Sequence, residues 1–312
     1  MQVSNIKRFV RKVALFSILM VASLLLLGFL LPYDGSFESE QIVKDELLRN
    51  NDDNPKVVLT GGSSVAFGYN SDSLSSWLGK PVYNNGLHGG FGMKFIIDNC
   101  SQYLNEGDVL VVIPEYGCFG GGVANGGIAL TNLVLMDPLR YGRLLNVRQW
   151  NSVLNSYPPS LFWKLAAFAS SLSNNEKHGP YSRKSFNSLG DNIANKGTMK
   201  LNMEETSILS GGVNQEFVDY FFAKLSELES KGVKIVCYPP AITHKVYAES
   251  KIQCEKIYDL FESKGHPFVR PLQNSVYPDS LFFDTHYHLN DKGALNNTKE
   301  LYYAILKSGV LE

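Results

Sequence analysis

Short apolar runs alternate with amphipathic stretches along most of the chain after residue 55. Four of these runs are rich in β-branched residues and predict strands, at 57–60, 82–83, 109–113 and 233–238. Between them, apolar residues recur at helical spacing, as in "SDSLSSWLG", "FGMKFIIDNCSQYLN" and "NQEFVDYFFAKLSELESKG". Alternating strands and helices favour a mainly parallel sheet with helices on both faces, so we expect an α/β fold with three layers, α/β/α.

The N-terminus has a different pattern. Four basic residues within 7–12 precede 19 uncharged residues, 13–31, and Pro32 follows. A helix of that length covers about 30 Å, the thickness of a bilayer's hydrocarbon core. The basic flank predicts a cytoplasmic N-terminus, with the rest of the chain outside, periplasmic or extracellular. A cleaved signal peptide is the alternative, but the residues before Pro32 make a poor cleavage site, so we expect one uncleaved transmembrane helix.

These patterns divide the chain into three parts. Residues 1–32 are expected to form the cytoplasmic tip and the anchor, 33–55 a membrane-proximal linker with a polar, acidic helix and a turn, and 56–312 one α/β domain. Within that domain, about 120–213 lacks a strand rhythm and is interpreted as an insertion. Its first part is apolar and helical and its second part is polar with turn-forming residues. Such an insertion could cap the edge of the sheet.

Composition and charge exclude some classes of function. The formal net charge is −1, and outside the first dozen residues no basic stripe is interleaved with aromatic residues, so a nucleic-acid partner is not expected. The cysteines show neither C-x-x-C pairing nor metal-ligand spacing. They are Cys100, Cys118, Cys237 and Cys254. We expect no cofactor and no structural metal.

The segment "VVLTGGSSVAFG" places small residues directly after a predicted central strand. Gly61 and Gly62 let the backbone turn sharply and let a ligand approach it closely, so Ser64 is predicted to stand at the carboxyl edge of the sheet, where α/β folds bind ligands. A serine there can be a nucleophile if a base lies nearby. It can also be a plain helix N-cap.

The segment "LFFDTHYHLNDKGALNN" supplies the strongest candidate for that base. Asp284 lies four residues before His288, close enough to turn back to the imidazole and fix its tautomer. His286 is a rival base or a residue lining the pocket. These three side chains could also suggest a metal site, but that reading leaves the serine segment unexplained.

Three segments, in order, resemble the sequence blocks of SGNH/GDSL hydrolases. They are "GGSSVAFG", "VYNNGLHGGFG" and "DTHYHLNDKGA", and the resemblance covers about residues 55–308 apart from the insertion. It implies a flavodoxin-like three-layer fold, with Ser64 as nucleophile, His288 as base and Asp284 as the orienting acid. It also implies that the amides of Ser64 and Gly89 hold the oxyanion, with Gly62 allowing close approach of the substrate.

The chain departs from the family's pattern at three points. Ser63 stands where the family commonly has Asp, and the acid and base are four residues apart rather than three. The third block normally supplies an asparagine amide, whereas this chain reads "VVIPEYG", and a Glu115 carboxylate can only accept hydrogen bonds. Tyr116 could donate in its place. His88, beside Gly89, could contact the substrate.

An anchor combined with "GGSS" and "YHLN" resembles the membrane-anchored branch of the family. That branch includes proteins similar to the D-alanyl transfer protein of teichoic acid synthesis and to O-acetylation factors of bacterial polysaccharides. The resemblance implies a serine esterase or O-acyltransferase of the cell envelope that acts on acylated polysaccharide or a small ester, and it leaves room for a membrane-bound acyl-transfer partner. The alternative is a non-catalytic binding or assembly subunit, favoured by the missing asparagine.

Overall fold

The four predicted strands are confirmed, and they form one parallel sheet in the order β2-β1-β3-β4. The computed structural model describes residues 2–31, 36–51, 54–171, 179–199, 201 and 212–312. The strands are β1 (Val57–Gly61), β2 (Val82–Asn84), β3 (Val109–Ile113) and β4 (Lys234–Cys237). A second parallel pair joins β5 (Ile242–Thr243) to β6 (Val276–Tyr277). The fold is therefore α/β with a parallel sheet.

The described residues form eleven α-helices. They are α1 (Gln2–Leu30), α2 (Glu40–Arg49), α3 (Ser63–Ala66), α4 (Ser71–Leu78), α5 (Met93–Cys100), α6 (Ile128–Met136), α7 (Pro138–Tyr141), α8 (Val147–Ser171), α9 (Gln215–Ser230), α10 (His244–Ser263) and α11 (Asp291–Ser308).

Alternate residues of the central strands belong to different hydrophobic clusters. Val58 of β1 belongs to a large cluster that also holds buried residues of α5, α9 and α10. Its neighbours Val57 and Leu59 belong to a second cluster with residues of α4 and α11. Because successive strand residues point to opposite faces, the sheet buries apolar side chains on both sides, which accounts for the nearly continuous apolar runs in the sequence.

The parallel register brings three loops to one edge of the sheet. Gly61 at the end of β1 pairs with Ile113 at the end of β3, and Leu59 pairs with Asn84 at the end of β2. The segments after these strands therefore emerge together at the carboxyl edge, where open α/β sheets bind ligands.

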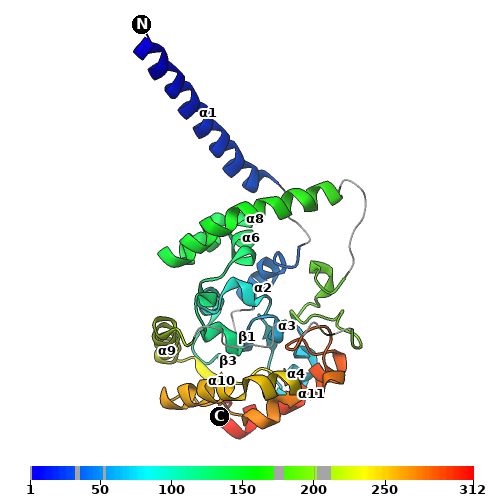
Figure 1. Cartoon of the computed structure of the whole chain (residues 1–312). Helices are drawn as coiled ribbons and strands as arrows, with labels where there is room; N and C mark the ends of the chain where they lie inside the picture. Colours follow the sequence, from blue (N-terminus) through cyan, green and yellow to red (C-terminus); the bar gives the residue numbers. More distant parts are fainter. Residues whose placement is uncertain (1, 32–35, 52–53, 172–178, 200, 202–211) are drawn as a thin grey trace.

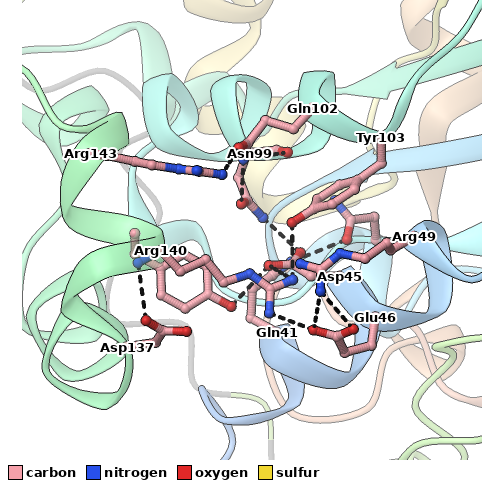
Figure 2. Close-up of polar contacts among 12 residues, drawn as sticks. Gln41, Asp45, Glu46, Arg49, Asn99, Gln102, Tyr103, Asp137, Arg140 and Arg143 are labelled. Carbon is pink, nitrogen blue, oxygen red and sulfur yellow. Dashed lines mark hydrogen bonds and ion pairs between the residues drawn. The ribbon is translucent and has the colours of Figure 1, made fainter.

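Helix α2 lies in the region expected to be a linker, yet it packs into the domain through buried polar groups. Asp45 is fully buried and accepts hydrogen bonds from Gln41 Nε2 and Asn99 Nδ2, both at 2.8 Å, and from the hydroxyl of Tyr141 at 2.9 Å. Figure 2 shows this cluster, with the Arg140 guanidinium 3.6 Å from the same carboxylate. Three donors satisfy the buried charge and join α2 to α5 and to the segment around α7.

A buried lysine on α2 makes a second connection. The Nζ of Lys44 donates to the backbone carbonyls of Asn84, Gly86 and Gly190, at 3.0, 2.5 and 2.6 Å. Burial lowers the pKa of Lys44 to about 8. The lysine thus ties α2 to the loop after β2 and to the second part of the insertion.

Helix α1 is long and apolar enough to cross a membrane. Its candidate span, Asn5–Leu30, has a mean hydropathy of 2.7 and is almost entirely exposed. Figure 1 shows it projecting from the rest of the molecule and meeting α8 at its foot.

The insertion divides into two parts with different neighbours. Its helices α6 and α8 pack against each other and contact α1. The later segment, 179–199, instead runs along the carboxyl edge of the sheet, where Asn192 N–H donates to Ala66 O at 3.0 Å. The first part also reaches this edge, because the Gly127 N–H donates to the carbonyl of Gly90, in the loop after β2, at 3.0 Å.

Candidate active site

Ser64 lies on α3, one turn that follows β1 directly. Gly62 occupies the N-cap position of this turn, and no side chain caps it. The Ser64 hydroxyl is buried and has no hydrogen-bond partner among the described residues. Ser64 is therefore not the helix cap. A buried hydroxyl without a partner is uncommon and needs an explanation, and a nucleophile awaiting its substrate is one.

Asp284 and His288 come together as the sequence predicts. The Asp284 Oδ1 lies 2.8 Å from His288 Nδ1, and both side chains are largely shielded from solvent. The hydroxyl of Thr285 accepts hydrogen bonds from the amides of Tyr287 and His288, which closes the turn that brings the carboxylate back to the ring. This contact places the hydrogen of the neutral ring on Nδ1 and leaves Nε2 as an acceptor.

Tyr181, from the insertion, completes this pair and was not predicted. Its hydroxyl donates to Asp284 Oδ2 at 2.5 Å and lies 3.1 Å from His288 Nδ1. Burial acts to raise the pKa of Asp284, but the hydrogen bonds from His288 and Tyr181 outweigh it and lower that pKa. Asp284 therefore stays ionised at neutral pH. Tyr181 lies in a polar stretch without periodicity, so no sequence signal marks it.

Aromatic stacking holds His288 against the helix that carries Ser64. The ring of Phe67, which follows α3, is nearly parallel to the His288 ring, with centroids 4.3 Å apart. The Nδ2 of Asn195 donates to the carbonyls of Phe67 and Leu289, at 3.2 and 2.9 Å, and so links the two segments. The Ser64 hydroxyl is not hydrogen-bonded to His288 here. Such contacts are often formed only once substrate is bound.

Glu115 occupies the place where the oxyanion donors were expected. Its Oε1 accepts a hydrogen bond from the Ser64 N–H at 3.0 Å and lies 3.4 Å from the Ser63 hydroxyl. A Cβ at Gly62 or at Gly89 would come within 2.5 and 2.7 Å of this carboxylate, so a larger residue at either position would push the Glu115 side chain away. Three residues predicted for the oxyanion site, Ser64, Gly62 and Gly89, thus lie around the Glu115 carboxylate. An oxyanion could not share this position with an ionised Glu115.

His88 borders the same carboxylate. Its Nδ1 accepts the Gly90 N–H at 2.9 Å, which leaves Nε2 to carry the hydrogen of the neutral ring. Burial lowers the pKa of His88 below its ordinary value, although nearby Glu38 and Glu115 act to raise it. His88 is therefore a neutral donor beside both the carboxylate and the histidine of the candidate site.

The other two predicted residues have different surroundings. Tyr116 is completely buried in the large hydrophobic cluster, and its pKa is raised by burial, with Tyr258 and Cys254 as neighbours. Its hydroxyl thus faces the core. The ring of His286 packs on that of Tyr287, with centroids 4.5 Å apart.

Histidine, cysteine and carboxylate side chains do not gather elsewhere in a way that could hold a metal. Across the described part of the chain, no group of three such side chains is arranged as a site. All four cysteines are unpaired, and burial raises the pKa of each thiol. These thiols are therefore poor nucleophiles.

No protein-family model matches the chain, and no curated protein matches it. The function must therefore be argued from the site itself.

Proposed function

We propose that this chain is a membrane-anchored serine enzyme of the SGNH/GDSL type, an esterase or an O-acyltransferase that acts on acylated cell-surface polysaccharide or a small ester. The observation that carries the proposal is the Asp284–His288 pair at 2.8 Å, stacked on Phe67 at the end of the Ser64 helix. A base oriented by a carboxylate beside a buried, unpartnered serine is the arrangement that acyl transfer requires.

The residues divide the reaction between them. His288 Nε2 takes the proton of the Ser64 hydroxyl as its oxygen attacks the acyl carbonyl, and Asp284 stabilises the imidazolium. His288 then gives that proton to the leaving sugar oxygen, which leaves an acyl group on Ser64. Water or a second hydroxyl loses its proton to His288 and attacks the acyl-enzyme, and the proton returns to Ser64. Water gives hydrolysis, and a sugar hydroxyl gives transfer.

The oxyanion site requires a change at Glu115. The substrate carbonyl competes with this carboxylate for the Ser64 N–H, so the Glu115 side chain has to move away before the tetrahedral oxygen can bind there. Glu115, which stands in the block where the family has an asparagine, would thus control when Ser64 can react.

The architecture supports the cellular placement. Helices pack on both sides of the sheet, as the three-layer fold requires, and α1 can serve as the anchor. Because basic residues precede the apolar run, we expect the N-terminus in the cytoplasm and the domain outside. A hydrolase or transferase held at that surface meets acylated envelope polymers directly.

One observation favours a second function, that of a non-catalytic binding or assembly subunit. Glu115 already satisfies the Ser64 amide, so the site as it stands is closed to an oxyanion. In that case the Ser64→Ala variant would keep the cellular role of the protein, whereas removal of the whole domain would abolish it.

The experiment that tests the proposed function follows the acyl group. Purified full-length protein is incubated with an O-acetylated oligosaccharide and an isotopically labelled, unacetylated acceptor. Acetate release or label in acetylated acceptor, absent with Ser64→Ala and kept with Ser63→Ala, is the expected result. If neither product forms with any acyl donor of this class, the result favours the binding subunit.

A further inference from the structure

Helix α8 exposes an unusual number of large apolar side chains. Leu154, Phe162 and Trp163 are 62, 65 and 58% exposed, and Val147 and Leu165 are exposed as well. Val147, Leu154, Phe162 and Leu165 follow one another at spacings that keep them on one side of a helix. A soluble surface seldom carries so much contiguous apolar area without a partner.

The same helix touches the foot of the anchor. The Tyr157 hydroxyl lies 2.9 and 2.7 Å from the carbonyls of Leu24 and Leu25, and Lys164 Nζ donates to the carbonyl of Gly28 at 2.9 Å. A Cβ on Gly28 would lie 2.2 Å from the Tyr157 hydroxyl, so the glycine permits this close approach. Figure 1 shows α8 crossing beneath the end of α1.

The position of these contacts along α1 determines how deep α8 lies in a membrane that α1 spans. The uncharged run 13–31 has 19 residues, so nearly all of it is needed to cross the hydrocarbon core. Leu24 precedes the end of this run by about 10 Å at the helical rise per residue. If α1 spans the bilayer, the part of α8 around Tyr157 therefore cannot stand clear of the membrane, because it contacts a part of α1 that lies within it.

We infer that α8 lies in the outer face of the lipid bilayer beside the anchor, with its exposed apolar side chains among the lipids. Tryptophan and tyrosine, which α8 supplies at Trp163 and Tyr157, are residues typical of that interface. Lipid is the occupant because the helix that exposes these apolar side chains contacts the apolar anchor directly. The inference rests on the anchor of the proposed function and is independent of any catalysis.

The three tryptophans of the chain provide the test. Trp150 and Trp163 are on α8, whereas Trp77 is on α4 and packs against Tyr302 of α11, at the end of the molecule away from α1 (Figure 1). Full-length protein is reconstituted in phosphatidylcholine vesicles with or without spin-labelled acyl chains. Two variants are compared: Trp77→Phe keeps the α8 tryptophans, and Trp150→Phe/Trp163→Phe keeps only Trp77. Thermal melting confirms that both are folded.

We expect the α8 tryptophans to be quenched at least threefold more strongly than Trp77, and most strongly by labels near the headgroups. Equal, weak quenching in both variants, on vesicles that carry the protein through flotation, overturns the inference and leaves the anchor intact. Failure of the wild-type chain to float with vesicles overturns both the anchor and the inference. An unaltered acyl-transfer result in either case leaves the enzymatic proposal standing.

Discussion

The carboxylate of Glu115 accepts a hydrogen bond from the backbone N–H of Ser64 at 3.0 Å. In an acyl-transfer site this N–H is the donor that the tetrahedral oxygen needs. Gly62 and Gly89 leave room for the carboxylate rather than for a side chain of their own. If the chain is the serine enzyme that we propose, this contact controls whether Ser64 can react, and one substitution can change it.

Replacing Glu115 with Gln is expected to raise the rate at which Ser64 reacts with a fluorophosphonate by at least about tenfold, since a single oxyanion donor is worth about 100-fold. The variant removes the negative charge and supplies an N–H donor of nearly the same size. Glu249→Gln, on the exposed surface of α10, is the matched control and should leave the rate unchanged. A slower reaction in Glu115→Gln would mean that the carboxylate itself assists the chemistry.

Tyr181→Phe removes one of the two hydrogen bonds that lower the pKa of Asp284. The pKa of Asp284 should rise, so the acidic limb of the pH–rate profile should move to higher pH, because His288 needs the ionised partner. At neutral pH we expect a three- to tenfold loss in rate, which corresponds to the free energy of about one hydrogen bond. Tyr303→Phe, at an exposed tyrosine on α11, serves as control. An unmoved acidic limb would show that Tyr181 does not act through Asp284.

The buried Asp45 should make stability depend on pH. Burial raises its pKa to about 6, from 3.8, so the folded chain binds more protons than the unfolded chain between those values. This contribution to the stability of the folded state is therefore greatest below pH 4 and is lost as pH rises through about 6, by up to about 3 kcal/mol.

Thermal unfolding in detergent at pH 4 and pH 7 measures this effect. Asp45→Asn should flatten the difference in melting temperature between the two pH values relative to the wild type. Glu249→Gln, at an exposed carboxylate on α10, should keep it. Identical pH dependence in the wild type and Asp45→Asn would contradict the assignment.

Lys44→Met tests whether α2 belongs to the domain. The substitution keeps an apolar stem of similar length but leaves the carbonyls of Asn84, Gly86 and Gly190 without this donor. We expect a loss of about 2–4 kcal/mol in the free energy of unfolding. Lys245→Met, on the exposed surface of α10, should change it by less than about 0.5 kcal/mol. If α2 is only a linker, Lys44→Met and Lys245→Met should both leave the free energy of unfolding nearly unchanged.

The elements that the sequence predicts well are those whose environment is local. The strands of the sheet are buried on both faces, so runs such as 109–113 are apolar throughout and easily recognised. Asp284 and His288 are four residues apart, and a turn suffices to bring them together. In the first case burial on both faces determines the strand, and in the second the interacting residues are only four positions apart.

The missed features depend on contacts between distant, polar parts of the chain. Tyr181 lies 103 residues before Asp284, in a stretch whose composition indicates only a loop. Lys44 is buried because three carbonyls from two other segments surround it, and a lysine in a stretch expected to be a linker gives no sign of this. The sequence shows that Glu115 cannot donate a hydrogen bond, but only the register of β1 and β3 brings it to the Ser64 amide.

The most direct test of the central claim is to locate the adduct that a fluorophosphonate forms with the full-length protein, by mass spectrometry of its peptides. We predict an adduct on Ser64 that persists in Ser63→Ala and is lost in both Ser64→Ala and His288→Ala. A folded wild-type protein that forms no adduct, or one whose adduct survives Ser64→Ala, would contradict a serine nucleophile at this site.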